Sequence, residues 1–68
     1  MEISARNQLR GQVTDIKLGG VMAEVRVQVG QSEIVSVITR GAAEALGIKV
    51  GDEVVAIVKA TAVMLGKP

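Results

Sequence analysis

Two short polar clusters, one near each end of the 68-residue chain, carry the side chains that could bind a ligand. The first cluster, Ser4-Ala5-Arg6-Asn7-Gln8, sets a hydroxyl, a guanidinium and two amides side by side. The second, Lys59-Ala60-Thr61, lies within an apolar run, where an unpaired ammonium would be costly unless an anion or a carboxylate met it. We therefore interpret the two clusters as halves of one site.

Every polar side chain in these clusters can donate hydrogen bonds, and neither cluster contains a carboxylate. Backbone N–H groups at the start of a predicted helix, near Thr39 to Ala42, are a further source of donors. A fully ionised tetrahedral oxyanion accepts hydrogen bonds and donates none, so a pocket made of donors suits it. Taken singly, each residue also has an ordinary structural interpretation: Ser4 as an exposed strand residue, Arg6 as a surface cation, Lys59 as the partner of a glutamate, and Thr39 as a helix cap.

The composition argues against several other classes of function. The chain has no cysteine and no histidine, and its seven acidic residues are scattered, so catalytic groups and transition-metal ligands are missing. It has no aromatic residue on which bases could stack, and a net charge of +1 provides no strong field toward nucleic acid or an anionic membrane. We therefore expect a protein that is not an enzyme, that coordinates no metal directly, and that binds neither nucleic acid nor membrane.

Residues 1–68 show no internal repeat, linker or low-complexity segment, so we expect a single domain. No run approaches the roughly 18 apolar residues of a membrane helix. The first residues also lack the basic and apolar regions of a signal peptide. The expected location is the cytoplasm.

The apolar pattern predicts strands in the first half of the chain. Apolar positions fall on odd numbers from Ile3 and move to even numbers at Ile16 and Leu18, which indicates a strand with a bulge. Gly11, near its middle, indicates a bend or a close backbone approach. After turns at Gly19-Gly20 and Gly30-Gln31, the pattern predicts a strictly alternating strand over 21–29 and a strand over 34–39 that is buried on both faces.

The second half predicts one short helix and a final stretch of strand. Thr39 is placed to cap a helix of about two turns that ends at Gly47. Residues 54–65 are apolar on both faces and rich in β-branched types, which favours strand, broken near Thr61 into two pieces. Five strands and one short helix together predict an all-β fold, an OB-like barrel.

The size and composition of the chain also predict that it assembles with other copies of itself. A domain of this size buries only about 60% of the surface that its unfolded form exposes, and this one has no cysteine or histidine for a disulfide or a structural metal. Hydrophobic residues make up 49% of the sequence, and two strands are apolar on both faces. We therefore expect a homo-oligomer in which a neighbouring subunit covers the second face.

The segment Ser4–Gly11, with the sequence SARNQLRG, resembles the opening of the molybdenum-binding Mop, or molbindin, family. Segments similar to the family's later signatures follow in the same order, so the resemblance covers essentially the whole chain; they are VIT at 37–39, VGDEV at 50–54 and VKATAVM at 58–64. The resemblance implies a cytoplasmic binder of molybdate or tungstate, assembled as a hexamer of OB-like subunits with the oxyanion sites between them. We expect no additional domain beside this one, so storage and homeostasis of the anion is the implied role.

The resemblance also implies which residues bind. One oxyanion would be held by six residues of the two clusters: Ser4, Ala5, Arg6, Lys59, Ala60 and Thr61. Asn7 would contribute to that site or to a neighbouring one, and Thr39 matches a position whose hydroxyl contributes. Ala42 stands where some members have serine, so only its backbone N–H could serve. Because no aromatic platform for a pterin is present, the bare anion is the expected ligand. The alternative is a structural or interaction oligomer in which the same polar residues satisfy subunit contacts.

Overall fold

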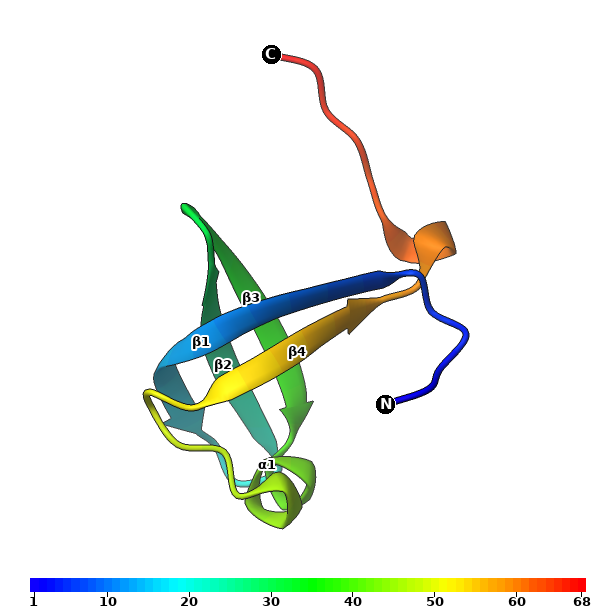
Figure 1. The fold of residues 1–68 in the computed structure, drawn as a ribbon. Coiled ribbons are helices and arrows are strands. Elements are labelled where there is room, and N and C mark those ends of the chain that lie inside the picture. Colours follow the sequence, from blue (N-terminus) through cyan, green and yellow to red (C-terminus); the bar gives the residue numbers. More distant parts are fainter.

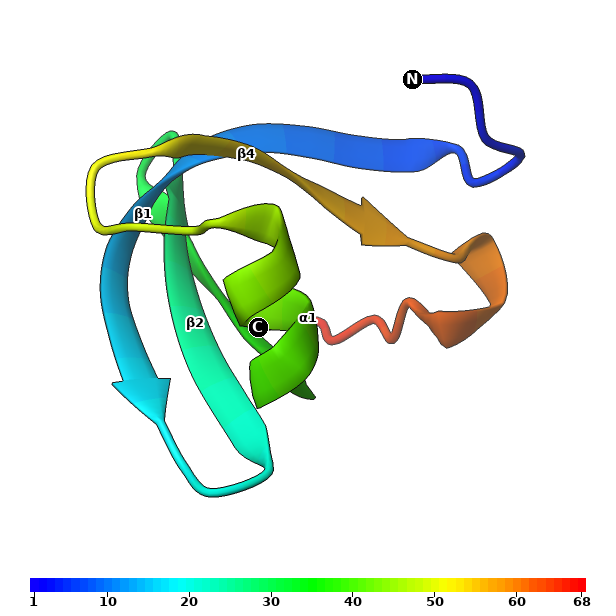
Figure 2. The ribbon, with the colours of Figure 1, turned by 90° about the horizontal axis from the view of Figure 1, so that it is seen from below.

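The computed structural model describes residues 1–68 as one curled antiparallel sheet with a short helix at one end. The strands are β1 (Asn7–Leu18), β2 (Met22–Val29), β3 (Ser32–Thr39) and β4 (Glu53–Val58), and their order in the sheet is β3-β2-β1-β4. Helix α1 (Arg40–Leu46) follows β3, and a single 3-10 turn, η1 (Ala60–Ala62), follows β4. The two views in Figures 1 and 2 show the sheet curling around α1, with β3 and β4 at its two edges.

Strand β1 is the centre of the sheet and pairs with β4 along its first half and with β2 along its second half. Its pairing with β2 shifts between Val13 and Asp15, so the predicted bulge is confirmed. The predicted close approach at Gly11 is also confirmed, because a Cβ added there would lie 2.5 Å from the Gln28 carbonyl oxygen and 2.6 Å from Val27 Cγ1. The bend of β1 therefore requires glycine at this position.

The hydrophobic core is small and lies on the inner side of the curl. Val13, Val25 and Val27 form its centre, and only 5 of the 68 residues are buried. As the alternation predicts, β2 turns Ala23, Val25 and Val27 inward and leaves its other face wet. With so few buried side chains, the chain alone is expected to be only marginally stable.

The wet face of β2 carries an ion-pair network centred on Arg26. Its guanidinium lies 2.6 Å from the Glu33 carboxylate on β3 and 3.6 Å from Glu24. The hydrogen bond with Glu33, followed by the charges of Glu33 and Glu24, raises the pKa of Arg26 above its ordinary value. Arg26 therefore stays charged and links β2 to β3 on the outside of the sheet.

The helix has the predicted ends. Thr39 Oγ1 accepts a hydrogen bond from the Ala42 N–H at 3.0 Å, which satisfies one of the free donors of the first turn. Gly47 closes the helix with φ at 64°, a left-handed conformation that favours glycine. No helix is long and apolar enough to cross a membrane.

Two predictions about the strands are wrong for the chain taken alone. The strand over 34–39 is not buried on both faces, because Val35 and Val37 on its outer face are 48% and 61% exposed. The last strand ends at Val58 rather than continuing to Leu65, although the predicted break near Thr61 is confirmed by the 3-10 turn. Residues 63–68 then run away from the sheet (Figure 1) and form no strand, so the chain by itself has four strands and forms no five-stranded barrel. A strand forms only where its backbone pairs with a neighbouring strand, and residues 63–68 pair with no strand of this chain.

Candidate anion-binding site

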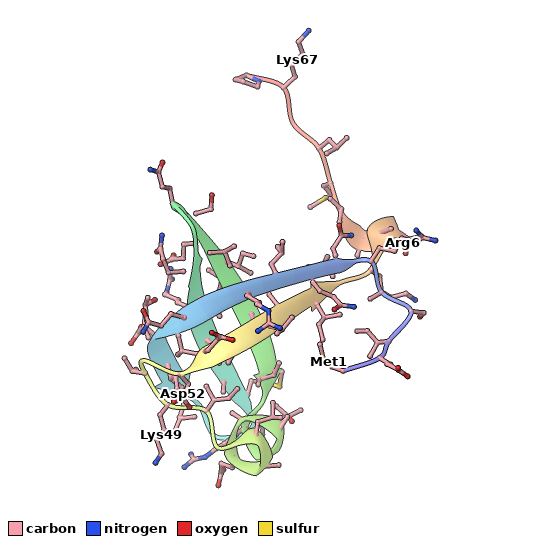
Figure 3. The ribbon with its side chains drawn as sticks, viewed as in Figure 1. Met1, Arg6, Lys49, Asp52 and Lys67 are labelled. Atoms are coloured by element: carbon pink, nitrogen blue, oxygen red, sulfur yellow. The ribbon has the colours of Figure 1, made fainter.

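The two polar clusters lie at the same end of the β1–β4 ladder. Asn7 and Val58 are the outermost pair of that ladder, so 4–6 directly precedes it and 59–61 directly follows it. Figure 3 shows Arg6 beside the 3-10 turn η1, where the two segments meet. The fold thus brings two segments that are more than fifty residues apart in the sequence to the same end of one ladder within a single chain.

Side-chain amides fix the backbone of both segments. Asn7 Nδ2 donates to the Val58 carbonyl at 3.1 Å, which ties the first segment to the end of β4. Gln8 Nε2 donates to the Ala5 carbonyl at 2.9 Å and closes a local turn. The second segment is shaped by its own backbone, since the Ala62 N–H donates to the Lys59 carbonyl at 2.9 Å. Both clusters therefore have a defined backbone course.

The charges at this end of the ladder are positive and unpaired. The structure contains four ion pairs, and all of them use Arg10, Arg26 or Arg40. Neither Arg6 nor Lys59 meets a carboxylate, so the interpretation of Lys59 as the partner of a glutamate is wrong for this chain. Ser4, Arg6, Lys59, Ala60 and Thr61 are all exposed and Ala5 is half-buried, so this end is an open, donor-rich surface.

Thr39 and Ala42 lie elsewhere. Thr39 pairs with Met22 at the start of β2, near the end of β1 that is far from Asn7. The adjacent Arg40 bonds to that same region, with its backbone N–H on the Val21 carbonyl at 2.7 Å and its Nη1 on the Gly19 carbonyl at 3.2 Å. Within one chain, therefore, the structure does not bring Thr39 to the clusters, and its hydroxyl serves as the helix cap.

Comparison with known proteins identifies the family. Residues 3–65 match the TOBE domain family. The chain is 48% identical over 66 residues to molybdenum-pterin-binding protein 2 of Clostridium pasteurianum, covering 96% of this chain and 97% of that protein. The chain belongs to the Mop family of TOBE-domain proteins. It is also 48% identical to the molybdenum transport protein ModE of Azotobacter vinelandii, but it spans only 24% of the length of that larger protein.

Solved structures of Mop-family proteins share the fold. A molybdate-binding protein from Sporomusa ovata superimposes with a TM-score of 0.94 at 39% identity, over 98% of this chain and all of that one. The molybdate-bound form of ModG, described as a cytoplasmic molybdate-binding protein, gives a TM-score of 0.92 at 42% identity, with this chain covering 49% of its length. The fold of this chain is thus shared with solved molybdate-binding proteins.

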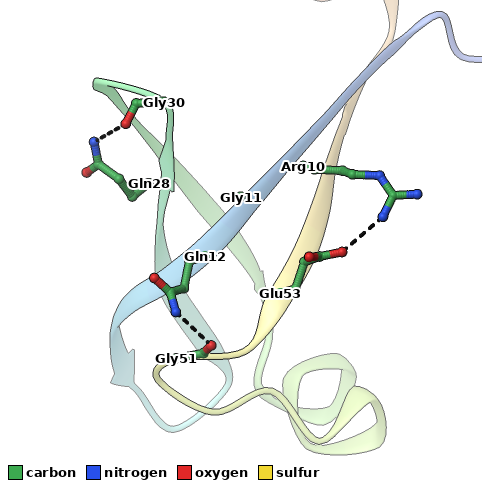
Figure 4. Close-up of a pocket in the computed structure, with 7 residues that line it drawn as sticks. All are labelled: Arg10, Gly11, Gln12, Gln28, Gly30, Gly51 and Glu53. Atoms are coloured by element: carbon green, nitrogen blue, oxygen red, sulfur yellow. Dashed lines mark hydrogen bonds and ion pairs between the residues drawn. The ribbon is translucent and has the colours of Figure 1, made fainter.

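Two hollows of this Mop-family chain were not found by sequence reasoning. The first, of about 340 Å³, is lined by polar residues and glycines, and Figure 4 shows that its side chains are satisfied locally. Arg10 pairs with Glu53 at 2.9 Å, and the Gln12 and Gln28 amides donate to backbone carbonyls. No free cation remains there for an anion. The sequence pattern does not predict that these residues lie close together, because their proximity depends on the bend of β1 at Gly11.

The second hollow is an apolar cleft of about 490 Å³ on the open side of the curl, between the two edge strands. Aliphatic side chains of β2, β3 and β4 form most of its walls, among them Val25, Val27, Ile34, Ile38 and Val54.

Proposed function

We propose that the protein binds molybdate or tungstate as the intact oxyanion and serves to store and buffer it in the cytoplasm, without catalysis. One observation carries the proposal: Arg6 and Lys59 lie at the same end of one ladder, and neither is paired with a carboxylate. Their two positive charges match the double negative charge of the anion.

Each residue of the clusters has a role suited to its chemistry. The Arg6 guanidinium can donate to two oxygens at once through its planar fork, whereas the Lys59 ammonium acts as a compact charge. The hydroxyls of Ser4 and Thr61 donate single hydrogen bonds, and Ala5 and Ala60 can contribute only backbone N–H groups. The absence of a carboxylate matters as much as these donors, because a carboxylate in the site would repel the anion.

The comparisons support this ligand. The relatives in Clostridium pasteurianum are named for molybdenum and pterin, and the Sporomusa ovata protein is described as molybdate-binding. We favour the bare anion over a pterin complex because the chain has no aromatic side chain to stack on a pterin ring.

We further propose that the working form is a homo-oligomer, a hexamer, with the anion sites at subunit boundaries. The tail beyond η1 is apolar and unpartnered, with Met64 92% and Leu65 95% exposed. The cleft between the edge strands β3 and β4 is lined mainly by aliphatic side chains and could take one further apolar strand. A tail from a second copy would satisfy both. That arrangement would also place a neighbouring subunit over the open anion site, which is otherwise exposed.

Calorimetric titration of the purified protein tests the ligand. Molybdate and tungstate should bind and compete for the same sites, and both should raise the melting temperature by mass action. Sulfate, which is smaller and equally charged, should compete poorly. Equal binding of sulfate and molybdate would overturn the selectivity. An oligomer that binds none of the three anions would favour the alternative, a purely structural assembly. A stable 7.1 kDa monomer in sedimentation would contradict the proposed assembly.

A further inference from the structure

The two cations of the proposed site share one local feature. In each cluster, the carbonyl of the residue immediately before the cation accepts a hydrogen bond from an amide side chain. The Ala5 carbonyl, before Arg6, accepts from Gln8 Nε2 at 2.9 Å. The Val58 carbonyl, before Lys59, accepts from Asn7 Nδ2 at 3.1 Å. Both amides come from consecutive residues at the start of β1.

These bonds matter to an anion because carbonyl oxygens repel it. A carbonyl oxygen carries partial negative charge, and one that is free to turn toward a doubly charged oxyanion weakens its binding. An amide N–H that donates a hydrogen bond to the carbonyl oxygen offsets part of that negative charge and fixes the direction in which the carbonyl points. All peptide bonds of the chain are trans, so fixing the Ala5 carbonyl on one side directs the Arg6 N–H to the opposite side.

We propose that Gln8 and Asn7 are positioning residues of the anion site: they do not need to touch the anion, but they hold the carbonyls that precede Arg6 and Lys59. This inference rests on the proposed function and assigns to both amides a role different from direct contact. It explains why amides, which are uncharged, stand next to the cations: a carboxylate cannot donate to a carbonyl and would itself repel the ligand.

The chain offers a matched control on the same strand. Gln12 Nε2 donates to the Gly51 carbonyl at 3.1 Å, in an exposed bond of the same kind as that of Gln8. Gln12 lies on the same face of β1 but lines the polar hollow rather than the anion site (Figure 4). Gln8→Met and Gln12→Met each remove one exposed amide and keep an unbranched side chain of similar length. A general effect of losing such a bond should appear in both variants.

The experiment is a titration of the wild-type protein and both variants with molybdate, and with perrhenate, a tetrahedral oxyanion of similar size that carries one negative charge. Gln8→Met should weaken molybdate binding about fivefold, the scale of one hydrogen bond. Gln12→Met should leave it within about twofold. Because the energy of a carbonyl with an ion is proportional to the ionic charge, perrhenate should lose only about the square root of that factor, roughly twofold.

Three results would overturn the inference. Gln8→Met could bind molybdate as the wild type does, or no more weakly than Gln12→Met. Alternatively, Gln8→Met could lose the same factor for both anions, which would mean that Gln8 only stiffens the loop, since ordering the loop costs the same for either anion. Asn7→Leu provides a second test at the other carbonyl, with the same expected difference between the two anions. If the wild-type protein itself fails to bind molybdate, the proposed function fails, which is a distinct outcome.

Discussion

Replacing Lys59 by methionine should weaken anion binding without disturbing the fold. Lys59 is exposed and makes no ion pair or side-chain hydrogen bond, so its removal leaves no unpaired partner behind. We expect the free energy of unfolding of the anion-free protein to change by less than about 0.5 kcal/mol. A hydrogen bond to a charged group contributes roughly 1.5 to 3 kcal/mol, so the molybdate dissociation constant should rise roughly 10- to 150-fold.

The control for charge alone is Lys17→Met. Lys17 is also exposed and unpaired, but it lies at the opposite end of β1, beside Glu24 of β2. At about 0.15 M salt the Debye length is about 8 Å, so its loss should change the dissociation constant by less than about twofold. Titration calorimetry and sedimentation of both variants, with and without molybdate, give the comparison.

The outcomes for Lys59→Met separate a binding role from a structural one. In an empty site, Arg6 and Lys59 would repel each other, so the anion-free oligomer should persist or become more stable in the variant. Normal molybdate binding by Lys59→Met would show that the site is misplaced. Dissociation into monomers without the anion would show that Lys59 is a structural residue. An equal loss of molybdate affinity in Lys17→Met would show that the effect depends only on the net charge of the protein.

Four further predictions follow from the geometry. Arg6→Lys should keep the charge but lose the planar fork, so molybdate affinity measured by calorimetry should fall while sedimentation is unchanged. Gly11→Ala should destabilise the protein by about 1–3 kcal/mol in urea unfolding, because the new Cβ meets the Gln28 carbonyl at 2.5 Å. Gly20→Ala, with nothing within 4 Å, should be nearly neutral. Leu65→Asp should shift sedimentation toward smaller species, whereas Lys67→Ala should not, since only the first places a charge in the proposed contact. Thr39→Val should lower the free energy of unfolding in urea by about 1 kcal/mol through the lost helix cap, because the Ala42 N–H loses its acceptor.

Features set by neighbouring residues could be predicted from the sequence. The change of parity in the first strand located the bulge, and Thr39 and Gly47 located the ends of the helix, because each depends on contacts within a few residues. The interpretation of the two clusters as halves of one site came from their shared donor chemistry, and the structure places them at the same end of one ladder. Their exact course was not predictable, since it depends on the Asn7–Val58 pairing across the sheet.

The wrong predictions share one physical cause. An apolar pattern reports how much burial a segment needs, but it does not say which molecule provides that burial. Residues 34–39 and 54–65 were both predicted to be apolar on two faces, yet in the single chain Val37 and Leu65 remain exposed. Thr39, which the resemblance assigns to the site, ends β3 near the end of β1 that is far from Asn7, and its contribution to an oligomer's site stays a prediction. Val37 and Leu65 both lie on apolar surfaces that a neighbouring subunit would cover in the proposed oligomer.

One covalent segment connects the proposed site to the proposed assembly. Lys59–Thr61 would supply anion contacts in the proposed site, and the apolar tail begins at Val63, just after η1. An anion that orders Lys59–Thr61 restricts the directions that the tail can take. Docking of the tail on a second copy restricts the conformation of Lys59–Thr61 in return. Because such coupling is reciprocal, the factor by which molybdate favours association must equal the factor by which association favours molybdate. The short 3-10 turn η1, which contains Ala60 and Thr61 and leads directly into the tail, is therefore the element through which ligand and assembly would act on each other.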